Sequence, residues 1–218
     1  VLERGADGGL ALDGDADRAL LVDETGSVLD GDDILVAWAR KLQSDGGLPG
    51  GRVVATVMSN FGLEQTLQND GMGVIRCSVG DREVWMTMKE HGAALGGEQS
   101  GHIICSHYGV SGDGLLTGTH LLAIAAERGV PVSDLSDIVR LPQVLLNGPV
   151  SRKLPFEELP QVSAELAEAN RRLSQRGRVL LRYSGTERLA RVMVEGEDAA
   201  EIQTLADRIA DALRFELG

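Results

Sequence analysis

Three carboxylates at alternate positions make the segment DGDADR, residues 13–18, the most highly charged part of the sequence. If the segment loops around one point, the side chains of Asp13, Asp15 and Asp17 converge and repel one another. A hard divalent cation relieves that repulsion, because Mg²⁺ and Ca²⁺ prefer oxygen ligands in proteins. The segment therefore predicts a Mg²⁺ site, with the Arg18 guanidinium beside it, where it could meet a phosphate group.

Two other interpretations of this segment stay open. In one, the three aspartates take positions one, three and five of an EF-hand loop and Glu24 takes position twelve, which is typical of a Ca²⁺-binding structural protein. Against it, position six of such a loop needs glycine and holds Arg18, and the flanking residues read as strands, not helices. In the other interpretation, the segment is a solvated acidic turn that binds no metal.

A glycine-rich segment, GGEQSGH at residues 96–102, brings three hydrogen-bonding side chains close together in sequence. Glu98 supplies an acceptor, Ser100 a hydroxyl group and His102 a titratable imidazole. Such a set suits the hydroxyl groups of a sugar, although an ordinary hairpin turn explains the same spacing.

A third segment, RYSGTE at residues 182–187, combines groups that suit a phosphate. Its hydroxyls, its backbone N–H groups and the guanidinium groups of Arg182 and of Arg191 on the following strand match phosphate geometry. No helix is expected after the segment, so the loop amides and the two arginines would have to hold the anion. A plain β-turn is the alternative.

A shorter motif, Gly80-Asp81-Arg82, closes a predicted strand and opens a predicted helix. In that position the Arg82 side chain could reach a ligand. Asp81 is the expected N-cap of the helix, a role that is compatible with ligand binding by its neighbour.

The elements around these segments alternate between strand and helix, which favours an α/β layer structure. The valine-rich run at residues 52–58 reads as a strand buried on both faces of a parallel sheet. Asp30 is the candidate N-cap of a helix with apolar residues at helical spacing. The predicted strands are residues 9–12, 19–22, 27–29, 52–58, 73–79, 93–96 and 102–105, and the predicted helices are residues 32–44, 61–69, 81–91 and 113–128.

Prolines gather between residues 129 and 160, and we expect a domain boundary near residues 135–145. Beyond it, the pattern predicts a compact α+β unit. Its strands are expected at residues 143–150, 178–183 and 189–194, and its helices at residues 161–175 and 198–215. The predicted fold class is therefore a mixed-sheet α/β domain followed by a smaller α+β C-terminal domain.

The formal net charge of −12 would repel nucleic acid and anionic lipid over most of the surface, so neither is an expected partner. An anionic substrate would need a local cluster of cations or a bound metal. No apolar run approaches the ~20 residues that span a bilayer, and no signal peptide is evident. Cys77 and Cys105 read as buried, reduced thiols, the default for a cytoplasmic protein.

Taken together and in this order, DGDADR, GEQSGH and RYSGTE resemble the loops of the α-D-phosphohexomutase superfamily. VGDR at 79–82 and RYSGTE-x-LARVMVEG at 182–196 look most like its phosphoglucosamine mutase branch. The resemblance implies that residues 1–30 end the family's second domain and carry its metal loop. It makes residues 31–140 the sugar-binding third domain and residues 141–218 the phosphate-binding fourth domain. The first domain, with its phosphorylated serine, is not expected in this chain.

The resemblance also implies a reaction and a role for each segment. A phosphoserine donates its phosphoryl group to a hexosamine phosphate, and the other phosphate of the resulting bisphosphate returns to the serine. Glucosamine 6-phosphate and glucosamine 1-phosphate are interconverted in this way, for amino-sugar nucleotide and cell-wall precursor synthesis. His102 is a candidate general acid or base. The implied Mg²⁺ ligands are Asp13, Asp15 and Asp17, the implied catalytic residues are Arg18 and His102, and the implied substrate-binding residues are Arg82, Glu98, Ser100, Arg182, Ser184, Gly185, Thr186 and Arg191.

The chain departs from the family pattern at two positions: Arg188 stands where the family usually has proline, and Glu83 where the branch usually has tyrosine. Sugar identity stays open, because phosphomannomutases and phosphoglucomutases share most of these segments. A non-catalytic sugar-phosphate-binding module is the remaining alternative. The isolated chain is expected to be inactive, and a homodimer of the full-length protein is one arrangement left open.

Overall fold

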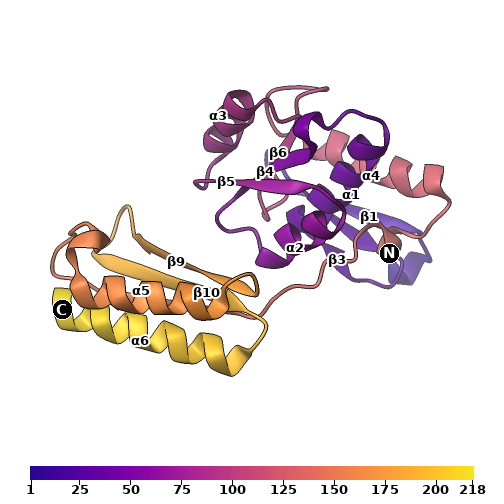
Figure 1. Ribbon diagram of the computed structural model, residues 1–218. Helices are drawn as coiled ribbons and strands as arrows, with labels where there is room; N and C mark the ends of the chain where they lie inside the picture. The colour runs from indigo at the N-terminus through magenta and orange to yellow at the C-terminus, as the bar shows by residue number, and fades with distance from the viewer. The chain divides into compact units, whose positions relative to one another are not determined.

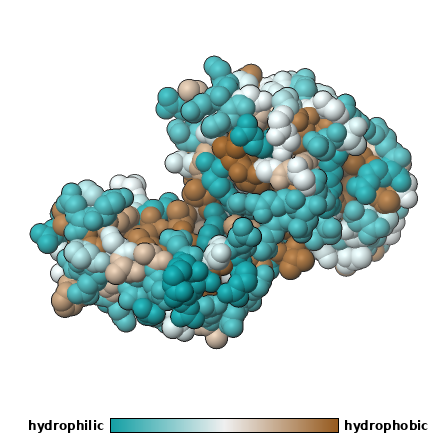
Figure 2. Space-filling model, viewed as in Figure 1, coloured by the Kyte–Doolittle hydropathy of each residue, from teal (hydrophilic) through white to brown (hydrophobic).

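The protein consists of two compact units, Val1–Val139 and Arg140–Gly218, in a computed structural model that describes all of residues 1–218. Figure 1 shows each unit with its own strands and helices. Figure 2 shows a surface that is mostly hydrophilic on this face, with apolar residues in separate patches. No helix combines the length and the apolar character that a membrane-spanning segment requires.

Unit 1 is built on a four-stranded mixed sheet with the strand order β5-β4-β6-β7. The central strand β4 pairs in parallel with β5 and β6, whereas β7 runs antiparallel to β6. β4 is buried from its second residue to its last, as its valine-rich sequence predicts for a strand covered on both faces. The strands are β4 (Arg52–Thr56), β5 (Gly73–Cys77), β6 (Leu95–Gly97) and β7 (Ile103–Cys105).

Helices cover both faces of this sheet. Val53 and Ala55 of β4 belong to a large core cluster that includes Trp38, whereas Val54 packs into a smaller cluster with Val84. Successive residues of a strand point to opposite faces, so the two clusters define an α/β/α sandwich. The helices of this unit are α1 (Gly31–Ser44), α2 (Phe61–Asn69), α3 (Asp81–His91) and α4 (Gly114–Arg128).

A small antiparallel sheet precedes the sandwich in sequence and has the strand order β1-β2-β3. It is formed by β1 (Gly8–Leu12), β2 (Ala19–Asp23) and β3 (Val28–Leu29). Leu12 pairs with Ala19 at the end of the β1–β2 ladder, so residues 13–18 form the loop of a hairpin. Because strands and not helices flank this loop, the EF-hand interpretation is wrong.

Unit 2 is a three-stranded antiparallel sheet with two helices packed side by side on it (Figure 1). The order of its strands is β8-β10-β9. Apolar residues of β10, among them Val192 and Val194, share a core with Ile202 and Ile209 of the last helix. The elements are β8 (Gln143–Pro149), α5 (Pro160–Leu173), β9 (Gly177–Tyr183), β10 (Leu189–Gly196) and α6 (Ala199–Leu217).

The predicted fold class is confirmed, and α2 and α3 have the predicted bounds. Asp30 caps α1 as predicted, with its side chain accepting a hydrogen bond from the Asp32 backbone N–H at 3.0 Å. The prediction that Asp81 caps α3 is wrong. Gly80 holds that position with φ of 131°, a conformation that favours glycine, and Asp81 is already the first helical residue. The predicted strand at residues 52–58 is two residues too long, because it ends at Thr56.

Candidate functional site

The hairpin loop at residues 13–18 gathers its three carboxylates around one point. Oxygen atoms of Asp13, Asp15 and Asp17 lie within 4.8 Å of one another. The loop closes on itself, because the backbone N–H of Arg18 donates to Oδ1 of Asp13 at 3.2 Å and that of Ala16 donates to the Asp13 carbonyl at 3.3 Å. Ala16 has φ of 59°, in the left-handed region that L-residues rarely occupy, and this turns the chain back.

Two features make this loop fit a hard divalent cation. Oδ1 of Asp17 is buried and has no hydrogen-bond partner, so the Arg18 guanidinium is the only positive charge near this oxygen, and a bound cation would add a direct ligand contact. Nε of Arg18 lies 2.8 Å from Asp13 Oδ2 and 3.5 Å from Asp17 Oδ1. Although desolvation opposes it, hydrogen bonding and charge from Arg18 lower the pKa of Asp13, so this carboxylate is a ready anionic ligand. Donors that are all oxygen suit Mg²⁺.

Glycines allow two other segments of unit 1 to approach the loop closely. Gly101 has φ of 92°, and its carbonyl accepts a hydrogen bond from the Ala19 N–H at 3.1 Å. The N–H of Gly114 donates to the Ala16 carbonyl at 2.9 Å, and a Cβ at Gly114 would lie 2.5 Å from the carbonyl oxygen of Arg18. The loop is therefore held from two sides by backbone segments. Each approaches closely because a glycine, without a side chain, lies at the point of contact.

His102 joins the acidic loop to the glycine-rich segment that follows β6. Arg18 and His102 form an isolated antiparallel β-bridge. Nδ1 of His102 lies 3.0 Å from Oδ2 of Asp17, and Nε2 accepts a hydrogen bond from the Gly112 backbone N–H at 3.2 Å. The His102 side chain is only 6% exposed, so the imidazole is an internal part of the loop's support.

The glycine-rich segment forms a tight turn between β6 and β7. The Gly101 N–H donates to the Glu98 carbonyl at 3.0 Å. Oε1 of Glu98 accepts from the Gly80 N–H at 2.8 Å, and Oε2 accepts from the Ser100 hydroxyl at 3.2 Å. Glu98 thus connects its own turn to the motif that begins α3, where Arg82 is exposed in the first turn of the helix. The turn between β6 and β7 therefore connects the acidic loop, through His102, to the segment carrying Arg82, through Glu98.

The predicted phosphate segment lies in unit 2, where residues 184–188 connect β9 to β10. Arg182 and Arg191 face each other as register partners on the two strands. Nη2 of Arg191 lies 3.2 Å from a Glu187 carboxylate oxygen, while its Nε is buried without a hydrogen-bond partner. The Ser184 hydroxyl accepts from the Glu187 N–H at 3.2 Å, which folds the loop back on itself. A strand follows the loop and not a helix, as predicted.

Sequence reasoning missed three contacts that support these segments. The ammonium group of Lys153 donates a hydrogen bond to the Ser184 carbonyl and so adds a cation beside the loop. Gly80 and Gly112 supply the backbone N–H groups that hold Glu98 and His102. For Gly80 and Gly112, the only local signal was the glycine itself. A glycine before a helix indicates a turn, but it does not show which side chain its N–H group will contact.

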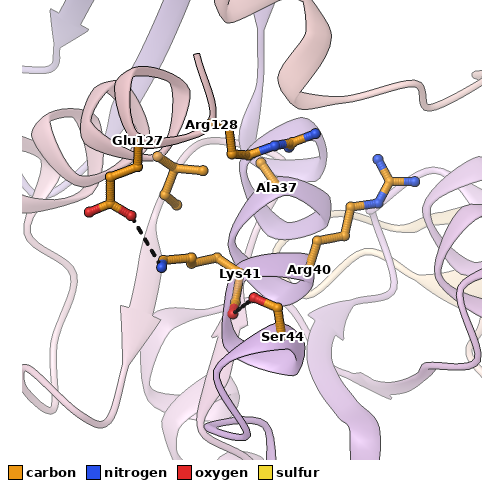
Figure 3. A pocket seen from close by; sticks show the side chains of 7 residues that line it. Ala37, Arg40, Lys41, Ser44, Glu127 and Arg128 are labelled. Atoms are coloured by element: carbon orange, nitrogen blue, oxygen red, sulfur yellow. Dashed lines mark hydrogen bonds and ion pairs between the residues drawn. The ribbon is translucent and has the colours of Figure 1, made fainter. Parts of the chain in front are cut away.

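A hollow of about 390 Å³ between α1 and α4 is a less suitable ligand site (Figure 3). Two of its three cations are already paired, whereas Arg128 lines the hollow without an ion pair. Arg40 contacts Asp70 at 2.7 Å and Asp137 at 2.8 Å, and Lys41 contacts Glu127 at 3.2 Å. An anion that used Arg40 or Lys41 would have to compete with these carboxylates, and the hollow contains none of the predicted site residues.

Both units match known domain families. Residues 30–141 match phosphoglucomutase/phosphomannomutase α/β/α domain III, and residues 145–212 match the phosphoglucomutase/phosphomannomutase C-terminal domain. Over 218 residues, the chain is 50% identical to a phosphoglucosamine mutase of Nitratidesulfovibrio vulgaris strain DP4. It is 48% identical to phosphoglucosamine mutases of Streptomyces coelicolor and Chlamydia felis over 219 residues. In all three cases the whole chain is covered, but only 48% of the relative, so the chain spans about half the length of these curated relatives.

Solved structures of low sequence identity share the fold. An N-acetylphosphoglucosamine mutase of Aspergillus fumigatus superposes with a TM-score of 0.75 at 22% identity, over 94% of this chain and 48% of that one. The same fungal enzyme in complex with GlcNAc-6P and magnesium gives 0.72 at 22% identity, over 93% and 51%. A phosphoglucomutase/phosphomannomutase family protein of Burkholderia thailandensis gives 0.71 at 23% identity, over 96% and 47%.

Proposed function

The chain belongs to the phosphoglucomutase/phosphomannomutase family, and from this premise we propose that it works as part of a longer phosphoglucosamine mutase. The enzyme would interconvert glucosamine 6-phosphate and glucosamine 1-phosphate through a phosphoserine and a bisphosphate intermediate. Along almost its whole length, the chain is about 50% identical in sequence to enzymes of that name, which supports this substrate class. The observation that carries the proposal is the convergence of three carboxylates within 4.8 Å beside Arg18.

Asp13, Asp15 and Asp17 would hold Mg²⁺, which when bound supplies a positive charge that stabilises a transferring phosphoryl group. In the transfer, the bond between the serine oxygen and phosphorus breaks while phosphorus bonds to a sugar hydroxyl oxygen, and the hydroxyl proton leaves to a base. Arg18 would neutralise charge that develops on the phosphoryl oxygens. The serine is expected in a part of the protein outside this chain.

The remaining residues would bind and orient the sugar phosphate. Glu98 and Ser100 offer an acceptor and a hydroxyl to sugar hydroxyl groups, and Arg82 would orient the substrate. In unit 2, Arg182 and Arg191 occupy paired positions on β9 and β10, and their guanidinium groups would suit the phosphate that does not react. Ser184, Gly185 and Thr186 would add hydroxyl and backbone N–H donors. Cys77 and Cys105 are free and buried, which suits the reduced thiols of a cytoplasmic enzyme.

A coupled assay on the full-length protein tests the substrate. Purified enzyme would be given glucosamine 6-phosphate, glucose 6-phosphate and mannose 6-phosphate in separate reactions with Mg²⁺. We expect the highest kcat/KM for the glucosamine ester. Far faster turnover of the glucose or mannose ester would make the protein a phosphoglucomutase or phosphomannomutase of the same family. Binding of sugar phosphate with no turnover of any ester, and no effect of Asp15→Asn, would favour a binding module.

A further inference from the structure

The contacts of His102 point to a role other than proton transfer. We propose that His102 is a positioning residue, which orients the Asp17 carboxylate in the metal site and is itself oriented by the backbone N–H of Gly112. This inference rests on the proposed metal site. It differs from the sequence-based assignment of His102 as a general acid or base.

The two hydrogen bonds of the ring determine where its proton lies. A backbone N–H can only donate, so Nε2 of His102 must accept the bond from Gly112 at 3.2 Å. A neutral imidazole has one donor and one acceptor, which leaves the proton on Nδ1. Nδ1 lies 3.0 Å from Oδ2 of Asp17, a distance at which its N–H donates to the carboxylate.

The surroundings of the ring prevent it from turning away. The side chain is 6% exposed, and its backbone is tied to Arg18 by the β-bridge. Gly112 packs so closely that a Cβ there would lie 2.6 Å from Cε1 of the ring and 2.7 Å from the Asp17 carbonyl oxygen. Both ring nitrogens are engaged within the protein, so neither is free to exchange a proton with a sugar hydroxyl.

The same contact fixes the direction of the metal ligand. Oδ2 of Asp17 is held by His102, and the other oxygen, Oδ1, is buried without a hydrogen-bond partner next to Arg18 and the acidic loop. Carboxylates that bind metals are commonly oriented by such a second hydrogen bond, and its loss typically weakens metal binding by about 10- to 100-fold. By holding Oδ2, His102 therefore orients the Asp17 carboxylate so that Oδ1 is the oxygen available to the cation.

Replacing His102 with asparagine or with glutamine distinguishes a positioning role from a proton-transfer role. The amide nitrogen of asparagine can stand near the place of Nδ1, whereas that of glutamine reaches the place of Nε2. We expect His102→Asn to bind Mn²⁺, measured by electron paramagnetic resonance on the 218-residue chain, nearly as tightly as wild type. His102→Gln and His102→Ala should bind it about 10- to 100-fold more weakly. In the full-length protein, His102→Asn should keep most turnover, whereas a proton-transfer role predicts a loss of roughly 10²–10⁴.

A second measurement needs no metal. Long-range ¹H–¹⁵N correlation spectra of the metal-free chain should show His102 with its proton on Nδ1, and Gly112→Ala should disturb that state. Urea unfolding of each variant controls for loss of fold. A proton on Nε2, or wild-type Mn²⁺ affinity in His102→Ala, would overturn this inference while leaving the metal site intact. A folded wild-type chain that binds no Mn²⁺ would overturn the metal site and this inference together.

Discussion

Arg191 on β10 lies directly opposite Arg182 on β9, with their α-carbons paired in the antiparallel register. Like charges at paired positions of two strands repel each other, and Arg191 is ion-paired with Glu187 at 3.2 Å. A phosphate group would relieve the repulsion, because guanidinium groups donate to phosphate oxygens in a planar fork. This pairing supports the proposed anion site in unit 2.

Arg182→Ala should therefore weaken binding of the sugar phosphate. A hydrogen bond to a charged group contributes about 1.5–3 kcal/mol, which corresponds to roughly 10- to 100-fold in affinity. In the full-length enzyme we expect KM to rise by that factor, with a smaller change in kcat. The control is Arg214→Ala, which removes an exposed arginine of α6 that pairs only locally with Asp211. A loss confined to kcat in Arg182→Ala would contradict the binding role.

Arg18→Ala should separate cation binding from turnover. Because Arg18 is ion-paired with Asp13 and Asp17, its guanidinium competes with a cation for the same carboxylates. Ion pairs of exposed groups are weak because solvent screens them, so we expect Mg²⁺ affinity to rise only modestly, by up to roughly fivefold. Turnover should fall by about 10²–10³, because the charge that stabilises the transferring phosphoryl group is lost.

Calorimetric titration of Mg²⁺ and a turnover assay on the same variant would check both effects of Arg18→Ala. The control is Arg4→Ala, since Arg4 is exposed and ends the first turn of the chain. Weaker Mg²⁺ binding in Arg18→Ala would show that the arginine supports the site and does not compete for it.

Asp32→Asn should change how the stability of unit 1 depends on pH. Asp32 is buried, and desolvation raises its pKa from 3.8 to about 6, although its hydrogen bond from the Asn60 N–H opposes the rise. Between these two values the folded state binds more protons than the unfolded state. The contribution of Asp32 to the free energy of unfolding is thus fully present below pH 3.8 and is lost as pH rises through about 6.

The shift of about two pKa units corresponds to roughly 3 kcal/mol, so the stability of Asp32→Asn relative to wild type should rise by that order from pH 4 to pH 7. Trp38 and Trp85 both lie in unit 1, so tryptophan fluorescence during urea unfolding reports this unit. Asp7→Asn, at an exposed position, is the matched control. Equal pH dependence of wild type and Asp32→Asn would contradict the role of the Asp32 carboxyl.

Local patterns were enough to predict most of the elements. The helices at residues 61–69 and 81–91 have the predicted bounds. In both places the spacing of the apolar residues changes from that of a strand to that of an amphipathic helix, and this change is visible in the local sequence. The capping role of Asp81 was wrong for a local reason. The positive φ of Gly80 lets the chain turn one residue earlier than the side-chain preference of aspartate suggests.

Contacts between segments could not be predicted in this way. Asp17 and His102 are 85 residues apart, and nothing near either residue shows that they meet. The contact depends on backbone approach at Gly101, Gly112 and Gly114, where the absence of a side chain permits packing but does not specify a partner. Lys153 was missed for the same reason, since it reaches the carbonyl of Ser184 from another loop.

Calorimetric titration of Mg²⁺ into the 218-residue chain tests the central claim most directly, because the proposed roles of the three aspartates and of His102 depend on a cation at residues 13–18. The wild-type chain should bind one Mg²⁺, and Asp15→Asn should bind it about 10-fold or more weakly, since one anionic ligand is lost. Asp7→Asn should bind like wild type. Mg²⁺ binding that is absent in the wild-type chain, or that is the same in Asp15→Asn, would contradict the claim and leave the loop a solvated acidic turn.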